Sequence, residues 1–432
     1  MTSPSRRSLV LPVLVLLAIT LGSVSSIEPA SARGYTPQAG VTTNNPLGDR
    51  AHRLAITHHL IRTINSTPRH SKIRVSSWNI RSRAIVDALI RAHKRHVMVR
   101  VVMDRGNANP SNRNRDANRL QRALAHNGNL SRKPAMRSKL VKCVRSCRGR
   151  HGIAHSKFFL FQRAGRARDV VINGSFNATD LAANGQWNDV FTVRGKPGVY
   201  REFTTVFSQM FQDRPVQQGY RVRPFLGITT MFYPYTGVGA GADPVLRELR
   251  RVHCGGAKNS SDGHTKIRIA QTSWYGKRGT KIAWRVRGLA NHGCHIRIVY
   301  AVMGNEALRI LRREGPHPVP MRQIVQDPNG DGVYDRYLHM KVMTVRGNYG
   351  LNPKAWMTVN GSANWSPAVL ASDEAVLRLS SSGVVRRYNS WIDYLFKHPP
   401  KHPTSRTSPT GPALPGMRRS TALNPYSQIQ LD

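Results

Sequence analysis

One phrase occurs twice in this sequence, and that repetition constrains the fold more than any other feature. HSKFFLF (155–161) is followed by NGSFN (173–177), and HMKVMTV (339–345) is followed by NGSAN (360–364). Each copy reads as a His, one spacer, a Lys, an apolar run and then a Gly-Ser-x-Asn turn. A single His-x-Lys is common by chance, but two copies in the same order predict a duplicated unit.

The segments around the two phrases repeat as well. Each phrase is preceded by a predicted strand, helix and buried strand, over 71–80, 81–96 and 97–104 and again over 265–274, 281–293 and 295–303. A predicted helix opens each unit and another closes it, at 49–64 and 199–213 and at 243–252 and 384–398. The fold class is therefore predicted to be α/β, with tandem units at 45–215 and 225–398, mixed sheets covered by helices, and one active site at the interface between the units.

Both ends of the chain are expected to lie outside these units. Residues 1–32 read as an export signal, because Arg6 and Arg7 precede an apolar run at 9–21 and a small-residue ASA site follows at 30–32. An uncleaved anchor is the alternative. Residues 399–432 are rich in Pro, Ser and Thr and are predicted to be disordered. The mature protein is therefore predicted to be secreted.

The four cysteines fit an oxidising compartment. The economical pairing joins Cys143 to Cys147 and Cys254 to Cys294. A zinc site is the alternative, but no Cys-x-x-Cys pair occurs and the surroundings are rich in Arg.

The charge balance predicts a polyanionic partner. The formal net charge is +44, from 66 Lys and Arg against 22 Asp and Glu. Such an excess attracts nucleic acid, anionic membranes or acidic polymers, without distinguishing among them. An Arg-rich proteome combined with selection for solubility is the alternative explanation.

One copy of the phrase offers a nucleophile and a set of oxyanion donors. Residues i and i+2 of a strand project to the same face, so His155 and Lys157 should point together while Ser156 points away. The Gly-Ser-x-Asn turn adds a hydroxyl and an amide, and its glycine allows close backbone approach. Doubling this set suits a tetrahedral phosphate with one His on each side of phosphorus.

A nucleophilic imidazole needs a partner that fixes its tautomer. Acidic residues are scarce here, so those that follow the two turns are the candidates. They are Asp189, twelve residues after Asn177, and Asp373 and Glu374, nine and ten residues after Asn364.

Two His-x-Lys motifs, each followed by Gly-Ser-x-Asn and then by acidic residues, resemble the phospholipase D superfamily over residues 45–400. The resemblance implies a phosphodiesterase that works through a covalent phosphohistidine, without a metal or another cofactor. By position, it implies that His155 is the nucleophile and that His339 is the general acid and then the base. It assigns the phosphate oxygens and the orientation of the histidines to the following residues: Lys157, Lys341, Asn177 and Asn364, with Ser175 and Ser362 nearby, for the phosphate; Asp189 and either Asp373 or Glu374 for the histidines.

Some residues depart from this pattern or extend it. The superfamily usually has an Asp five residues after the Lys, where this chain has Gln162 and Arg346. Asp373, Trp187 and Trp365 are predicted at the substrate, with core packing as the alternative for the two tryptophans. DPNGDGVYD (327–335) resembles part of a calcium loop but lacks the terminal Glu of an EF-hand, so it is interpreted as a turn and no metal is expected.

These observations favour a secreted, monomeric enzyme that hydrolyses a phospholipid head-group phosphodiester at an anionic membrane surface, with no obligate protein partner. A metal-independent nuclease of the same superfamily is the close alternative, because the charge fits nucleic acid equally well. A non-catalytic polyanion-binding protein is the alternative from another class, and it would not need two reactive imidazoles.

Overall fold

The computed structural model describes Met1 and residues 34–237 and 242–401. All but Met1 of the predicted signal (1–32) and all but the first three residues of the predicted tail (399–432) lie outside the described residues. The fold is mixed α/β, as predicted, and the two sheets repeat one topology.

The first sheet has seven strands in the order β1-β10-β7-β6-β2-β4-β5. The three strands β2, β4 and β5 run parallel to one another, and the other neighbouring pairs are antiparallel. The strands span Gly40–Thr43 (β1), Asp189–Val193 (β10), Ala167–Gly174 (β7), Phe158–Ala164 (β6), Lys72–Ser76 (β2), Met98–Asp104 (β4) and Lys139–Cys143 (β5).

The second sheet has nine strands and contains the same arrangement. Its order β21-β20-β19-β14-β15-β16 matches β10-β7-β6-β2-β4-β5, again with three parallel strands at one edge. The strands span Ala375–Ser380 (β21), Asn352–Gly361 (β20), Lys341–Tyr349 (β19), Lys266–Trp274 (β14), His295–Met303 (β15) and Met321–Gln323 (β16). Additional strands are β11 (Arg221–Phe225), β12 (Ile228–Phe232) and β13 (Val252–His253).

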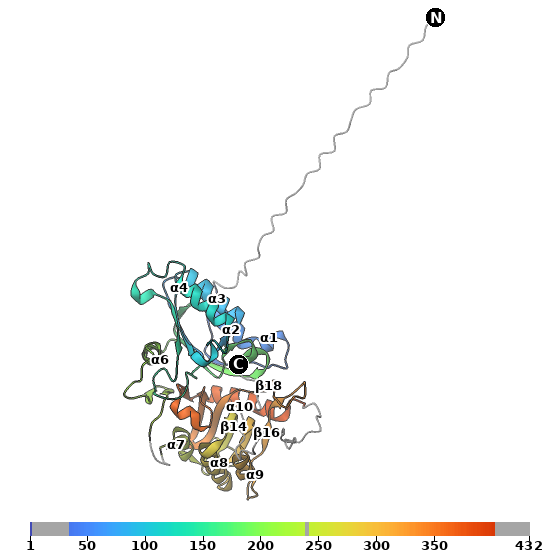
Figure 1. Cartoon of the computed structure of the whole chain (residues 1–432). Coiled ribbons are helices and arrows are strands. Elements are labelled where there is room, and N and C mark those ends of the chain that lie inside the picture. The colour runs from blue at the N-terminus through green and yellow to red at the C-terminus, as the bar shows by residue number, and fades with distance from the viewer. Residues whose placement is uncertain (2–33, 238–241, 402–432) are drawn as a thin grey trace, which may run out of the picture.

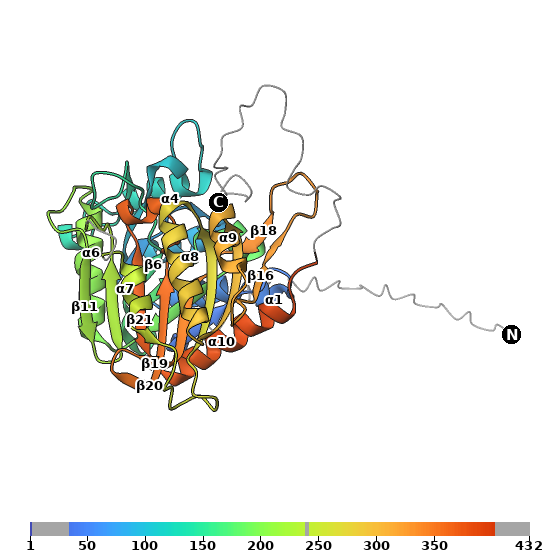
Figure 2. The ribbon, with the colours of Figure 1, turned by 90° about the horizontal axis from the view of Figure 1, so that it is seen from below.

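The helices form outer and inner layers (Figure 1). The outer face of the first sheet is covered by α2 (Ala55–Asn65), α3 (Arg83–Lys94) and α4 (Arg115–Ala125), and that of the second by α7 (Pro244–Arg250), α8 (Gly276–Asn291) and α9 (Asn305–Arg312). The inner helices α6 (Pro197–Phe211) and α10 (Ser382–Lys397) each pack against strands of both sheets. The two sheets therefore face each other across a shared core, which is also visible from below in Figure 2.

Short elements complete the described chain. Two of these short strands connect the halves: β9 (Gln186–Trp187) of the first half pairs in parallel with β18 (Arg336–Leu338) of the second. The others are α1 (Arg50–Arg53), β3 (Ile80–Arg81), η1 (Arg105–Asn107), η2 (Pro134–Met136), β8 (Ala178–Thr179), α5 (Asp180–Asn184), β17 (Val325–Gln326) and η3 (Pro367–Ala371).

Strand alternation explains why β6 can serve both layers. Phe159 and Phe161 belong to the core beneath the outer helices, whereas Phe158 and Leu160 belong to the core around α6. All four side chains are at most 1% exposed. A strand buried on both faces in this way reads as the continuous apolar run FFLF rather than as an alternating pattern.

One predicted boundary is wrong. The helix expected at 281–293 begins five residues earlier, at Gly276. Gly279 lies against Trp274, and a Cβ atom at Gly279 would come within 2.9 Å of the indole Cδ1 atom of Trp274. Tertiary packing therefore starts this helix in a stretch that holds two glycines and looks like a loop by propensity.

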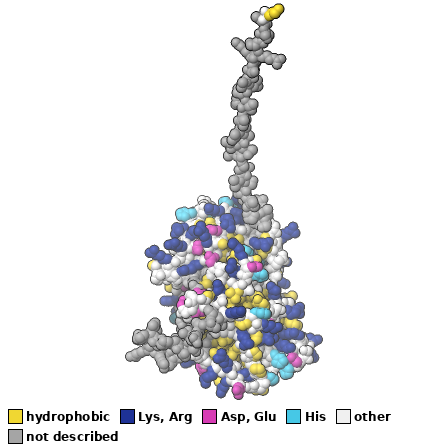
Figure 3. Space-filling view, turned by 90° about the vertical axis from the view of Figure 1, so that its right-hand side faces the viewer, with side chains coloured by type: hydrophobic (Ala, Val, Ile, Leu, Met, Phe, Trp, Pro, Cys, Tyr) yellow, Lys and Arg dark blue, Asp and Glu magenta, His cyan; other side chains and the backbone are white. Residues whose placement is uncertain are grey.

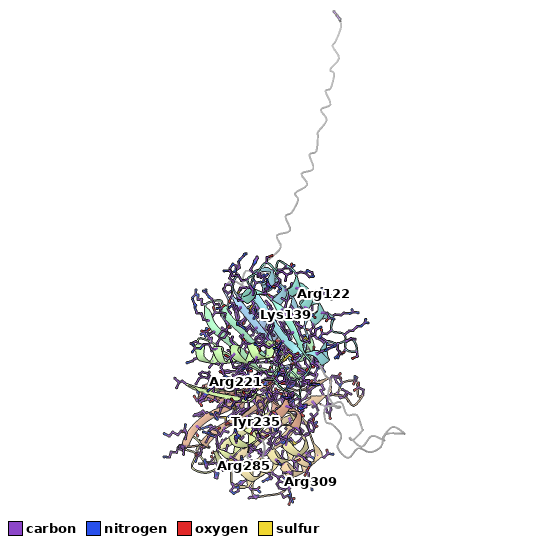
Figure 4. The ribbon with its side chains drawn as sticks, turned by 60° about the vertical axis from the view of Figure 1, so that its left-hand side comes forward. Arg122, Lys139, Arg221, Tyr235, Arg285 and Arg309 are labelled. Atoms are coloured by element: carbon purple, nitrogen blue, oxygen red, sulfur yellow. A yellow bond between two sulfur atoms is a disulfide. The ribbon has the colours of Figure 1, made fainter. Side chains whose placement is uncertain are left out.

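Both predicted disulfides are present, Cys143–Cys147 and Cys254–Cys294. No helix among the described residues is long and apolar enough to cross a membrane. The two disulfides are compatible with export. Lys and Arg side chains are spread over both halves of the face in Figure 3. Figure 4 shows the same spread on another side, with Arg122 and Lys139 in the first half and Arg285 and Arg309 in the second.

Candidate active site

A cavity of about 240 Å³ lies where the two halves meet, and both repeated histidines line it. Its polar wall includes Asn364 and Glu374. Lys157, Asn177 and Lys341 are buried, with at most 4% exposure each. The structure thus gathers groups from both copies of the repeated phrase around one space.

His155 is oriented by a carboxylate from the other half of the chain. Its Nδ1 atom lies 2.8 Å from Oε1 of Glu374, a residue 219 positions away. A carboxylate only accepts at neutral pH, so Nδ1 carries the proton and Nε2 presents a lone pair. This is the tautomer that a nucleophilic imidazole requires.

His339 is oriented by an amide from the first half instead. Its Nδ1 atom lies 2.8 Å from Oδ1 of Asn188. The Asn188 Nδ2 atom donates to the carbonyl of Ala182 at 3.0 Å, which identifies the other amide atom as the oxygen. His339 therefore also holds its proton on Nδ1, but beside a neutral partner.

The backbone repeats this exchange between the halves. The His155 N–H donates to the carbonyl of Asp373 at 3.1 Å, and the His339 N–H donates to the carbonyl of Trp187 at 2.8 Å. Asp373 precedes Glu374, and Trp187 precedes Asn188. Each histidine is thus held, at backbone and side chain, by a dipeptide of the opposite half.

The two serines of the repeated turns hold the orienting partners. Ser175 Oγ donates to Asn188 Oδ1 at 2.8 Å, and Ser362 Oγ donates to Glu374 Oε2. Both serines are 0% exposed. Their hydroxyls, which were predicted to lie near a phosphate, are committed to the groups behind the histidines.

The glycines of these turns allow close approach, but to a strand. A Cβ atom at Gly174 would lie 2.2 Å from the carbonyl oxygen of Asp189, and one at Gly361 would lie 2.2 Å from that of Ala375. Any larger residue would push away the strand that carries Asn188 or Glu374.

Each lysine is tethered to its own histidine. Lys157 Nζ donates to the carbonyl of His155 at 2.5 Å, and Lys341 Nζ donates to that of His339 at 2.7 Å. On the reverse face, Ser156 contacts Met210 of α6, which agrees with the predicted strand alternation. Two ammonium groups are thereby held beside the imidazoles.

Burial lowers the pKa of both histidines. The pKa of His155 falls to about 4, with Lys157 adding to the effect of burial and Glu374 opposing it. The pKa of His339 falls well below its usual value through burial and the charges of Lys341 and Lys157. Both imidazoles are therefore neutral at pH 7 in the free protein.

Asp189 does not orient either histidine, contrary to the prediction. Its carboxylate accepts from Tyr388 at 2.7 Å and from Asn360 at 3.2 Å, and burial raises its pKa. Adjacent residues of a strand face opposite sides, so a position one residue away, Asn188, reaches His339 instead. When the two repeats are aligned at Val190 and Val376, Asn188 stands opposite Glu374. This alignment could have identified Asn188 as the partner of His339.

The other residues predicted at the substrate are structural. The Asp373 carboxylate accepts from the backbone N–H of Cys147. Trp187 is 1% exposed in the core between the halves, and Trp365 packs edge-on against Trp274 at 4.6 Å. Asp373 and Trp365 form isolated β-bridges, and the residues next to them, Glu374, Asn364 and Ser366, line the cavity.

Sequence reasoning missed the aromatic walls of the cavity. Trp78 lies 5.8 Å from the His155 ring, and Tyr337 lies 5.9 Å from the His339 ring, measured between ring centroids. The repeat places Thr272 opposite Trp78, and both line the cavity. Trp78 follows β2 and Thr272 lies near the end of β14, so both stand at the carboxyl edge of parallel strands. Ligands commonly bind at this edge, and the sequence could therefore have indicated both residues.

The positions of the missing motif Asp lie away from this cavity lining. Gln162 is exposed on β6, and Arg346 lies over the ring of Trp356 at 4.9 Å. The acidic segment 327–335 forms a turn, in which Asp327 accepts from the N–H groups of Gly330 and Gly332 at 2.8 and 2.9 Å. This agrees with its interpretation as a turn.

Comparison with known proteins gives one family match and similarities of fold. Residues 60–211 match the family model described as cardiolipin synthase, PLD-like domain. Polyphosphate kinase from Porphyromonas gingivalis has a TM-score of 0.53 at 11% identity, over 85% of this chain and 53% of the kinase, so the chain spans about half the length of that protein. Phosphatidylserine synthase from Haemophilus influenzae has a TM-score of 0.52 at 11% identity, over 85% of this chain and 88% of the synthase. Nuc, a phospholipase D family member from Salmonella typhimurium, has a TM-score of 0.29 at 20% identity, over 42% and 100%. No curated protein sequence gives a significant match.

Residues 60–211 therefore form a PLD-like domain. The two facing α/β halves that hold the histidine pair share their fold with the polyphosphate kinase and the phosphatidylserine synthase.

Proposed function

We propose that this protein is an exported phosphodiesterase that hydrolyses the head-group phosphodiester of a phospholipid through a covalent phosphohistidine on His155. The observation that carries the proposal is the pair of neutral imidazoles that line one cavity with different orienting partners. Both histidines come from one chain, so a monomer suffices.

In the first step, Nε2 of His155 attacks phosphorus and the bond from phosphorus to the head-group oxygen breaks. The new N–P bond leaves positive charge on the imidazole, which the Glu374 carboxylate stabilises through Nδ1–H. His339, protonated as the anionic substrate raises its pKa, gives its Nε2 proton to the departing alkoxide.

In the second step, His339 is neutral and takes a proton from water. The resulting hydroxide attacks phosphorus on the opposite side, the N–P bond breaks, and His155 returns to its neutral form. Phosphatidate leaves, His339 releases its proton to solvent, and it takes up a proton again when the next anionic substrate binds. Lys157, Lys341, Asn177 and Asn364 stabilise the phosphoryl oxygens, so no divalent ion is required.

The cavity walls favour a lipid. Ile153, Ala368 and Val369 bring aliphatic surface to the space that the two histidines line, and Trp78 and Tyr337 add aromatic surface. These walls suit the glyceryl end of a phospholipid. The matching family model also takes its description from a lipid synthase.

A nuclease remains the second candidate because of the charge of +44. The test measures turnover of purified protein on phosphatidylcholine vesicles, phosphatidylglycerol vesicles, single-stranded DNA and RNA, all with EDTA present. Release of head group at the highest kcat/KM supports the proposal, and preferential cleavage of nucleic acid would replace it with the second candidate. Complete loss of activity in EDTA, restored by calcium or zinc, would contradict the metal-free mechanism.

The site of covalent attachment is tested separately. Acid quenching during turnover of labelled substrate should place phosphorus on His155, identified by mass spectrometry of peptides. Label on His339 alone would reverse the two roles.

A further inference from the structure

The segment that carries His155 runs between a disulfide loop and a strand end of the other half. Ala154 pairs in parallel with Asp373. Gly152 approaches Ala371 so closely that a Cβ atom at Gly152 would lie 2.3 Å from the carbonyl oxygen. The Ile153 N–H donates to Ser372 Oγ at 3.2 Å. The backbone on both sides of the interface is therefore fixed as one unit.

Asp373 makes three contacts in this unit. Its N–H donates to the carbonyl of Ile153 at 2.9 Å, and its carbonyl accepts from the His155 N–H. Its carboxylate accepts from the N–H of Cys147, inside the disulfide loop. The next residue is Glu374, which orients His155, so any shift of Asp373 moves the orienting carboxylate.

The loop itself is anchored at both ends. The disulfide closes it from Cys143, the last residue of β5, to Cys147. Arg148, 1% exposed, then donates to Gln209, to the carbonyl of Tyr233 and to that of Gly219 at 3.0, 2.8 and 2.8 Å. Between these anchors, Val144 is 60% exposed. The disulfide is therefore the covalent constraint that holds the Cys147 N–H against Asp373 on the β5 side.

We propose that Asp373 is a positioning residue through which the Cys143–Cys147 disulfide sets the geometry of the Glu374–His155 pair, so that reduction of this disulfide lowers turnover. The proposal rests on the proposed function for its kinetic consequence. Its structural consequence, a weakened Nδ1–H hydrogen bond to Glu374, does not depend on any substrate.

The chemistry of a buried carboxylate explains the coupling. Burial raises the pKa of Asp373 to about 7, while Arg148 and the Cys147 N–H act in the opposite direction. If the loop opens, the buried carboxylate loses its donors Cys147 and Ser146, both of which belong to the loop, and must move or take up a proton. A displacement of about 1 Å at a catalytic group can cost about 10²-fold in rate.

The second disulfide is a matched control. Cys254–Cys294 joins the end of β13 to the residue before β15, in the core beneath the outer helices. The cavity instead lies near the other ends of the parallel strands, at Thr272 of β14. This disulfide should therefore support stability without touching the geometry of the site.

The experiment compares four variants of the full-length protein. They are Cys143→Ala with Cys147→Ala, Cys254→Ala with Cys294→Ala, Asp373→Ala and Asp373→Asn. We expect the first pair and Asp373→Ala to lower kcat by about 10- to 100-fold with little change in KM. Asp373→Asn keeps an oxygen acceptor for the Cys147 N–H and should stay within about threefold of the wild type. The second cysteine pair should lower Tm by several degrees and leave kcat unchanged below that temperature.

A readout independent of turnover separates this proposal from the proposed function. In protein labelled with ¹⁵N-histidine, the Nδ1 resonance of His155, assigned with His155→Gln, reports the hydrogen bond to Glu374. It should shift in the first pair and in Asp373→Ala, and remain in place in the second pair and in Asp373→Asn. If the folded first pair keeps the wild-type resonance, the proposal is wrong. If the resonance shifts as expected but the wild type cleaves no phosphodiester, only the proposed function fails.

Discussion

The two half-sites have the same geometry and different charge. On one side a carboxylate, Glu374, orients His155, and on the other an amide, Asn188, orients His339. The serine behind each partner, the backbone contact of each histidine and the tethered lysine are all repeated. Duplication has thus preserved the directions of the hydrogen bonds, while one substitution distinguishes the chemistry of the two imidazoles.

The difference suits two distinct roles. A phosphorylated imidazole is cationic when Nδ1 is protonated, so a carboxylate at Nδ1 stabilises the intermediate. A general acid that next acts as a base must release its proton easily, and a neutral partner favours that release. For this reason we propose His155 as the nucleophile and His339 as the acid and base, the roles that the resemblance in the sequence implies.

The largest expected effect comes from removing each imidazole. His155→Ala and His339→Ala should each lower kcat at least about 10³-fold on a phospholipid. On a diester with a nitrophenolate leaving group, which needs no proton, the first step should recover about 10²-fold in His339→Ala only. A burst of nitrophenol measured by stopped flow checks this. Equal recovery in both variants would show that the two sides do not differ in role.

Removing the negative charge of the partner that orients His155 should lower kcat less than removing an imidazole does. Glu374→Gln keeps an acceptor for Nδ1–H and removes the negative charge, so kcat should fall about 10- to 100-fold and less phosphohistidine should accumulate. Asn188→Gln is the control for a change on the other side that adds no charge. Unchanged kcat and trapped intermediate in a folded Glu374→Gln variant would mean that the carboxylate only positions His155.

The pH dependence should reveal the same difference. Productive free enzyme needs His155 neutral and His339 protonated, and both pKa values are depressed, that of His155 to about 4. As pH rises above the pKa of His339, kcat/KM should fall, because the acid loses its proton. Asn188→Asp places a negative charge beside His339, raises its pKa, and should move this limb to higher pH by about one unit. If the fall of kcat/KM occurs at the same pH in Asn188→Asp as in the wild type, it reports the titration of a group other than His339.

The smallest expected effect concerns the cavity walls. Trp78→Ala removes aromatic surface beside His155 and should raise KM about five- to tenfold with little change in kcat. Thr272→Ala, at the equivalent position of the other half, should change KM less than about twofold. Steady-state kinetics on mixed vesicles checks both. Equal effects would indicate that the substrate contacts the two walls alike.

Predictions from the sequence succeeded where the information is local. They failed where a shift of one residue along a strand changes the face to which a side chain points. The strands, most helices, the histidines, the lysines and the cysteine pairs follow from periodicity and spacing. Asp189 was predicted as a partner because acidic residues are scarce in this chain, a criterion that an asparagine such as Asn188 does not meet. Only the pleat of β10 determines which of the two neighbours faces His339. The position of Trp187 depends on the tertiary structure in the same way, because its side chain faces the core and not the cavity.

By itself, the sequence determined that this protein has two repeated halves and that each half carries a histidine and a lysine on one strand face, and it predicted a phosphate or a similar oxyanion as the ligand. Only the tertiary structure decided that each half orients the histidine of the other. His155 and Glu374 are 219 positions apart, and His339 and Asn188 are 151 apart. No local pattern encodes such a contact, because it depends on how two sheets face each other across a shared core.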